Sequence, residues 1–249
     1  SVAYVRCATP ERFPFTVPDS YKQSARVLLL RHDIDHCPVE AHRMAEVESK
    51  LGICSSYYVL TTDQGAKWWD NQQKRREGLE LLRQMQSLGH EIGLHYDALG
   101  NYLTTGIPVS THLTETIALL KNEGLKIEGC AAHGSRVLTD LRTGQAPLSA
   151  YECTHPVYRD YVSYNIWKDD DRGTSKFKEH CLSEYGLKYE AYFINRDWYY
   201  ADDHVGNHGV KGPKEHAGLK AWEIKPEHVK ASDVMQALFH PIKWKGRLT

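Results

Sequence analysis

Side chains that can bind metal or move protons crowd into the stretch "RHDIDH" at residues 31–36 of the 249-residue chain. Asp33 and Asp35 stand two positions apart there, and His32 and His36 flank them. Residues i and i+2 of an extended backbone point to the same side, so the two carboxylates would face one site. One of them could then bind a cation while the other takes a proton from water. Considered alone, the stretch is more typical of a polar strand end with a capping role than of a metal site.

Three further histidines each close a short apolar run elsewhere in the chain. His95 ends "EIGLH", His133 ends "GCAAH" and His240 ends "ALFH", and the acidic residues Asp202 and Asp203 follow "WYYA". Taken singly, each of these histidines is compatible with a structural turn. Their shared position at the ends of apolar runs indicates a common site.

One divalent transition metal is the cofactor that these side chains predict. Asp35, His95 and His133 would supply one carboxylate and two imidazoles, a set that suits Zn²⁺, Fe²⁺, Co²⁺ or Mn²⁺, and zinc is our expectation. Asp33 would take a proton from water, and His240 would protonate the leaving group. The residues expected to contact substrate are Trp198, Arg136 and Asp203, with Asp202 as an equal alternative that would orient either His240 or the substrate.

Alternating strand and helix patterns supply the frame for this site. Short apolar runs predict strands at 26–31, 53–60, 90–96, 126–134, 188–196 and 234–241. Amphipathic patterns predict helices at 38–52, 75–89 and 110–124. This order implies a parallel sheet, and the chain length favours a closed or nearly closed (β/α) barrel over an open sheet. The carboxyl ends of barrel strands meet on one face, so the predicted site residues would converge there.

The chain is expected to be a single domain over 1–249, with 1–25 as an N-terminal extension packed on the barrel. A formal net charge of −1 gives no indication of nucleic-acid binding. No apolar run approaches the roughly 18–20 residues of a membrane span. The first residues lack a signal-peptide pattern and no cysteines form a C-x-x-C pair, so we expect a cytoplasmic protein with reduced thiols.

Two features of composition bear on ligands. The chain has 15 Tyr and 6 Trp against 5 Phe, and aromatic rings with a polar atom suit sugar faces and wet clefts. The tryptophans of "KWW" (67–69) are therefore candidates for either packing or sugar stacking. The histidines outside the predicted site that we expect at the surface are His42, His112, His180, His216 and His228.

The stretches "LLLRHDID" and "GHEIGLH" together resemble the polysaccharide deacetylases of carbohydrate esterase family four. The resemblance covers about residues 26–135 and extends to the terminal "ALFHP". It implies a distorted (β/α) barrel of seven strands. It also implies Asp33 as the catalytic base, Asp35 and His95 as metal ligands, and His240 as the acid.

The sequence departs from the family pattern at two places. The position of the family's second ligand histidine is Leu99, and the stretch that corresponds to its third motif reads "AAHGSR". We predict that His133 replaces the missing ligand, with Asp97 as a weaker substitute.

The resemblance implies a metal-dependent hydrolase that removes an N-acetyl or other acyl group from an amino sugar. The substrate would be a nucleotide- or lipid-linked precursor, or a unit, of a surface polysaccharide. One alternative is a hydrolase of another C–N bond, such as a cyclic amide. Another is a catalytically inactive carbohydrate-binding barrel.

Overall fold

The computed structural model describes residues 5–7, 26–62, 67–133, 182–194, 196–202, 212–213, 228–230 and 233–246. The strands in this part of the chain are β1 (Val5–Cys7), β2 (Arg26–Ile34), β3 (Ser56–Leu60), β4 (Glu91–Tyr96), β5 (Ile127–Ala132), β6 (Tyr189–Glu190), β7 (Trp198–Ala201) and β8 (Val234–Phe239). They run parallel in one sheet with the order β6-β5-β4-β3-β2-β8-β7, and β1 pairs with β2 beside this path.

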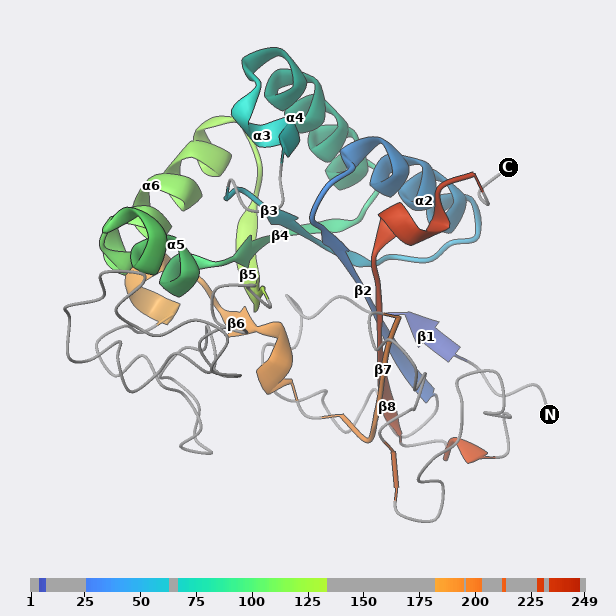
Figure 1. Cartoon of the computed structure of the whole chain (residues 1–249). Helices are drawn as coiled ribbons and strands as arrows, with labels where there is room; N and C mark the ends of the chain where they lie inside the picture. Colours follow the sequence, from blue (N-terminus) through green and yellow to red (C-terminus); the bar gives the residue numbers. More distant parts are fainter. Residues whose placement is uncertain are drawn as a thin grey trace.

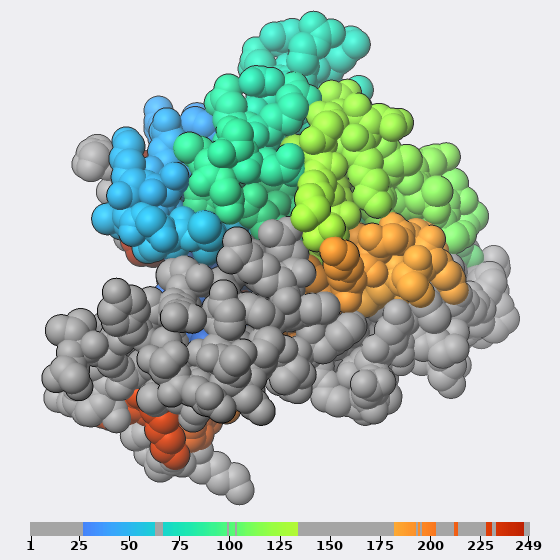
Figure 2. All heavy atoms as spheres, turned by 180° about the vertical axis from the view of Figure 1, so that it is seen from behind, coloured from blue at the N-terminus to red at the C-terminus, as the bar shows by residue number. Residues whose placement is uncertain are grey.

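The helices lie outside the curled sheet, as Figure 1 shows. They are α2 (Pro38–Lys50), α3 (Lys67–Asp70), α4 (Gln72–Ser87), α5 (Ala98–Thr105) and α6 (Val109–Asn122), with short 3-10 turns η3 (Leu182–Tyr185), η4 (Ala191–Phe193) and η8 (Pro241–Trp244). From behind, segments that follow one another in the sequence lie side by side across the surface (Figure 2). The strands therefore form a curled half-barrel wrapped by helices, which confirms the predicted distorted (β/α) barrel. No helix in the described ranges is long and apolar enough to cross a membrane.

The strand periodicity of two separates an outer core from an inner one. Side chains such as Ile34, Ile92 and Leu94 face the helices and belong to the larger apolar cluster. Leu29, Tyr58 and their inward-facing partners form a second cluster inside the half-barrel. The same alternation along β2 turns Arg31 and Asp33 toward the interior. The burial of the apolar side chains of β2 therefore determines which of its polar side chains face the site.

Two glycines make room for tyrosine rings inside the half-barrel. A Cβ on Gly93 would lie 2.6 Å from the ring of Tyr58, and one on Gly129 would lie 2.0 Å from that of Tyr189. The two hydroxyls are 2.8 Å apart, and Tyr189 also donates a hydrogen bond to Glu91. Gly93, the second glycine of "GHEIG", is therefore needed for close packing of the Tyr58 ring under the site.

Some local predictions were wrong. The segment 188–196, expected as one strand, forms only the two-residue β6 before it turns into η4. The carboxylate of Glu190 accepts hydrogen bonds from the backbone N–H groups of Tyr192 and Ala132, which bends the chain there. Helix α5 was not predicted, although Asp97 caps it at the Gly100 N–H (3.2 Å) and Gly106, with φ of 73°, ends it.

Candidate metal centre and active site

The cluster lies at the carboxyl ends of neighbouring strands. Asp33 is near the end of β2, and Asp35 follows that strand directly. His95 stands next to last in β4, and its Cα pairs with that of Ala131 in β5, so His133 emerges beside it just beyond β5. His240 follows β8, the other neighbour of β2. Strand register alone thus gathers these residues at one edge of the sheet.

Asp35, His95 and His133 form the candidate metal centre. Each offers one ligand atom, and these atoms all lie within 4.8 Å of one another. Nε2 of His95 is 3.5 Å from Oδ1 of Asp35, and the two imidazole rings stand at 89° with centroids 5.0 Å apart. This is the predicted ligand set, brought together from three different strands.

The protonation of His95 suits metal binding. Its Nδ1 lies 2.9 Å from the carbonyl oxygen of Ala131, which assigns the ring proton to Nδ1 and leaves the Nε2 lone pair facing the carboxylates. Burial lowers the pKa of His95, which favours the neutral ring that a metal needs. Within the described residues, the buried Oδ1 of Asp35 has no hydrogen-bond partner. Acceptor atoms that face one another in this way fit a divalent cation.

Asp97 lies beside the third candidate ligand. Its Oδ2 is 3.8 Å from Nδ1 of His133. Burial by itself would lower the pKa of His133, but Asp97, Asp35 and Asp33 together raise it. A carboxylate beside a ligating imidazole is the usual way in which proteins orient such a ring.

Arg31 and Asp33 form a buried ion pair below the candidate ligands. Nε and Nη2 of Arg31 donate to the two carboxylate oxygens at 2.8 Å and 2.7 Å. Burial by itself would raise the pKa of Asp33, but Arg31 and then His95 lower it to about 2. The guanidinium is held in turn by the ring of Tyr192, whose centroid is 4.3 Å away. Asp33 is therefore fixed in place as a carboxylate at every ordinary pH.

His240 and Asp202 form a second pair across the cluster. Nδ1 of His240 is 2.5 Å from Oδ1 of Asp202, whose other oxygen accepts the backbone N–H of His240 at 2.9 Å. Nε2 of His240 points toward Asp35, with 3.8 Å to Oδ2. Burial by itself would lower the pKa of His240, but the hydrogen bond to Asp202 and the nearby carboxylates raise it. The ring thus keeps its proton to higher pH than an isolated imidazole does, and Asp202 holds it in position.

The structure brings together Asp33, Asp35, His95, His133 and His240. It does not bring Trp198 to them: this residue opens β7, is fully buried and donates to Oδ2 of Asp233 at 2.8 Å. Arg136 and Asp203 lie outside the described residues.

Two site residues were not among the principal predictions. Arg31 has the same parity as Asp33, and an arginine directly after the aliphatic run of β2 was the available signal. Asp202, weighed only as an alternative to Asp203, is the carboxylate that contacts His240. By contrast, the side chain of His32 points to the opposite face of β2, where its Nε2 lies 2.7 Å from Glu48 of α2, and His36 is exposed.

No protein-family model matches the sequence, and no curated protein matches it. The chain is similar to solved structures at low sequence identity, among them the following three. A CE4 esterase from Streptococcus mutans is 13% identical with a TM-score of 0.44, over 90% of this chain and 77% of that one. The catalytic domain of a peptidoglycan N-acetylglucosamine deacetylase from Eubacterium rectale is 13% identical with a TM-score of 0.45, over 94% and 82% of the two chains. A mutant of a CE4 family pseudoenzyme with restored enzymatic activity is 10% identical with a TM-score of 0.41, over 86% and 56%.

Proposed function

We propose that the chain is a metal-dependent hydrolase that removes an acyl group, most simply N-acetyl, from an amino sugar. One observation carries the proposal: a base candidate, three ligand candidates and an acid candidate meet at one edge of a parallel sheet. The motif resemblance of "RHDID" and "GHEIGLH" supports the same reaction class.

Asp35, His95 and His133 would hold the metal. A divalent ion bound there would polarise the acyl carbonyl and lower the pKa of a water to about 7. The remaining chemistry falls to the protein side chains around these ligands.

Asp33 would accept a proton during hydrolysis. Its pKa of about 2 makes it a weak base, and accepting a proton from a donor of pKa near 7 would cost about 7 kcal/mol. That cost fits within the barrier of about 16 kcal/mol that corresponds to about 10 turnovers per second. The bidentate bond from Arg31 orients the carboxylate in return.

His240 would donate a proton to the departing amine. Its raised pKa supplies the protonated ring, and Asp202 fixes the ring so that Nε2 faces the cluster. A base on β2 and an acid after β8 would thus act on a scissile bond held between neighbouring strands.

The proposal is tested by acetate release from N-acetylated amino sugars with zinc supplied. Asp33→Asn and His95→Ala are expected to lower the rate at least about 100-fold. His42→Gln serves as a matched control because His42 lies on α2, where its contact is Glu46. Acetate release by correctly folded Asp33→Asn and His95→Ala proteins at the wild-type rate would refute the mechanism.

A substrate with a different C–N bond is the second candidate. His133 joins the ligand cluster from the stretch "AAHGSR", which departs from the family's third motif. A parallel assay with cyclic ureides discriminates: hydrolysis of these, without acetate release from sugars, would favour a cyclic amidase. Sugar binding by a protein that takes up no stoichiometric metal would favour an inactive binding barrel.

A further inference from the structure

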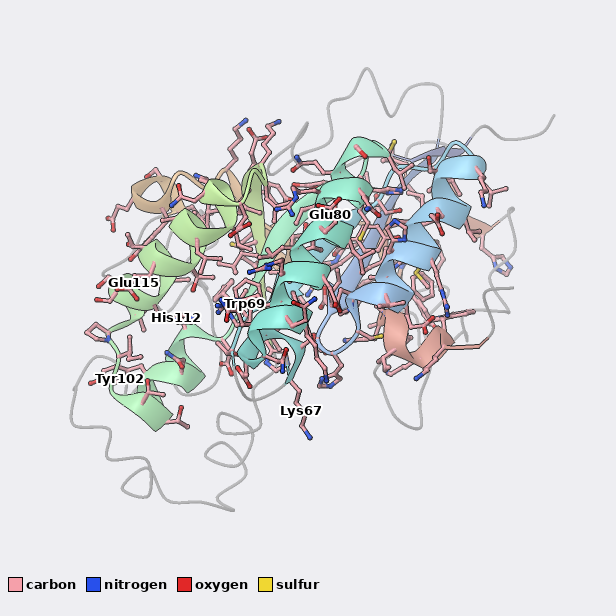
Figure 3. All side chains as sticks on the ribbon, turned by 90° about the horizontal axis from the view of Figure 1, so that it is seen from above. Lys67, Trp69, Glu80, Tyr102, His112 and Glu115 are labelled. Carbon is pink, nitrogen blue, oxygen red and sulfur yellow. The ribbon has the colours of Figure 1, made fainter. Side chains whose placement is uncertain are left out.

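A cavity of about 370 Å³ lies between α3, α5 and α6, beside the residues that follow β3. Its wall includes Thr62, Trp69, Arg75, Asn101, His112 and Glu115, and none of the candidate metal-centre residues line it. Figure 3 shows Trp69 on α3 with His112 and Glu115 on α6. The volume falls at the lower end of the roughly 300–1,000 Å³ typical of small-ligand pockets.

Two polar atoms in this wall need a partner. Within the described part of the chain, Oγ1 of Thr62 and Nδ2 of Asn101 are buried and make no hydrogen bond. Thr62 is only 5% exposed. A buried polar group without a partner is costly, so such atoms usually meet water or a ligand. Both residues line the cavity, which is where a partner could sit.

Trp69 and Arg75 add a flat wall with hydrogen-bond donors. The Arg75 guanidinium carbon lies 5.7 Å from the centroid of the Trp69 ring. Among the described residues, no hydrogen bond or ion pair of the Arg75 guanidinium is seen, and its N–H groups can reach a ligand against this wall. Trp69 is only 8% exposed, and the guanidinium lies over its ring, so this wall presents an aromatic surface partly covered by hydrogen-bond donors. Such a wall matches a ring that has both apolar and polar groups.

The charges of the wall favour a neutral ligand. The carboxylates of Asp70 and Glu115 oppose an anion, and the guanidinium of Arg75 opposes a cation. His112 is partly buried, contrary to the expectation of a surface position, and burial lowers its pKa, so it adds a neutral ring that both donates and accepts. Hydroxyl groups both donate and accept, so a neutral, hydroxyl-rich ring can pair with all of these groups.

We propose that this cavity is a second binding site, one that takes a neutral sugar ring packed against Trp69 and hydrogen-bonded to Thr62 and Asn101. The site lies near the candidate metal centre, because the Asn101 N–H donates to the Asp97 carbonyl (2.8 Å) and Asp97 contacts His133 (3.8 Å). Sugar binding in this cavity does not require catalysis, so it can be tested independently of the deacetylase proposal.

The test is NMR titration of the full chain with the methyl glycosides of glucose and N-acetylglucosamine, following the indole N–H of Trp69. We expect saturable shifts with a dissociation constant on the order of 1 mM or tighter. Thr62→Val and Asn101→Ala are each expected to weaken binding about 5-fold or more, the loss that corresponds to about one hydrogen bond. Thr104→Val is the matched control, because Thr104 bonds the α5 backbone and does not line the cavity.

Further arms separate this proposal from its rivals. Asp35→Asn is expected to leave the titration unchanged even if it abolishes metal binding, so failure of the metal proposal leaves this result intact. Glucuronate, glucosamine and glycine test an anion, a cation and a zwitterion, and tighter binding of any of them would overturn the assignment. So would absent shifts, or equal affinities of the Thr62→Val and Thr104→Val proteins once thermal melting has shown both to be folded.

Discussion

Arg31 donates hydrogen bonds to both carboxylate oxygens of Asp33, at 2.8 Å and 2.7 Å, although the two residues stand only two positions apart on the same strand. Both side chains are almost fully buried, at 1% and 3% exposure. A strand ordinarily directs such neighbours to one face without joining them. Here the long arginine side chain runs along β2 to reach the shorter carboxylate, so one strand carries the candidate base together with its counter-ion.

The first prediction concerns this pair. Arg31→Met would leave the Asp33 carboxylate buried without its counter-ion, so we expect unfolding free energy to fall by about 3–5 kcal/mol. The double variant Arg31→Met/Asp33→Asn removes the uncompensated charge and should recover much of this loss. Urea denaturation of the wild type, both single variants and the double variant gives the coupling energy directly. Strictly additive effects of the two substitutions would show that the pair is not a unit.

The second prediction concerns the candidate ligands. Asp35→Asn, His95→Gln and His133→Gln should each weaken zinc binding at least about 100-fold, since even residues that only orient ligands contribute 10- to 100-fold. Competition against a chromogenic chelator measures the affinity, and His42→Gln again serves as the control. Wild-type affinity in the His133 variant alone would mean that another group completes the centre.

The third prediction concerns the acid candidate. Asp202→Asn removes the charge that raises the pKa of His240, so this pKa should fall. The protonated ring would then be lost at lower pH, and the alkaline limb of kcat/KM should move to lower pH with a rate loss of about 10- to 100-fold. NMR titration of His240 checks the first effect, and a pH–rate profile checks the second.

A neighbouring lysine provides the control for Asp202. Lys243 donates to the backbone carbonyl of Asp202 at 2.7 Å, and Lys243→Met leaves the carboxylate in place. This variant should not lower the pKa of His240. An equal fall in both variants would assign the effect to local disruption.

The fourth prediction links stability to pH through Glu190. Burial raises the pKa of Glu190 from 4.5 to about 7, so the folded protein holds this proton more tightly than the unfolded chain does. Its contribution to stability is greatest below pH 4.5 and is lost as pH rises through about 7, on the order of 3 kcal/mol in all. Glu190→Gln should remove this slope, because its amide does not ionise. If the unfolding free energies of the wild type and of Glu190→Gln changed by the same amount between pH 4.5 and 8, the prediction would be contradicted.

The sequence alone was sufficient for the alternation of strands β2 to β5 with helices α2, α4 and α6, and for the convergence of the ionisable groups. The β2 run and the histidines that end apolar runs fix strand ends, and in a parallel sheet strand ends determine position. It was insufficient where a tertiary contact decides the outcome. The bend after Glu190 depends on a backbone N–H from β5, and the burial of Trp198 depends on Asp233. Pairing of Arg31 with Asp33 likewise needed side-chain geometry that residue spacing does not specify.

The order of synthesis bears on the central place of β2 in the sheet. Its neighbours β3 and β8 come from opposite parts of the chain, and β8 pairs with residues 27–32 of β2. A nascent chain that has not yet released residues 234–239 therefore leaves this edge of β2 without its backbone partner, and such an edge invites pairing with another molecule. The acid candidate His240 arrives with the same segment. Completion of the site and covering of this edge of β2 therefore both wait for the same C-terminal segment.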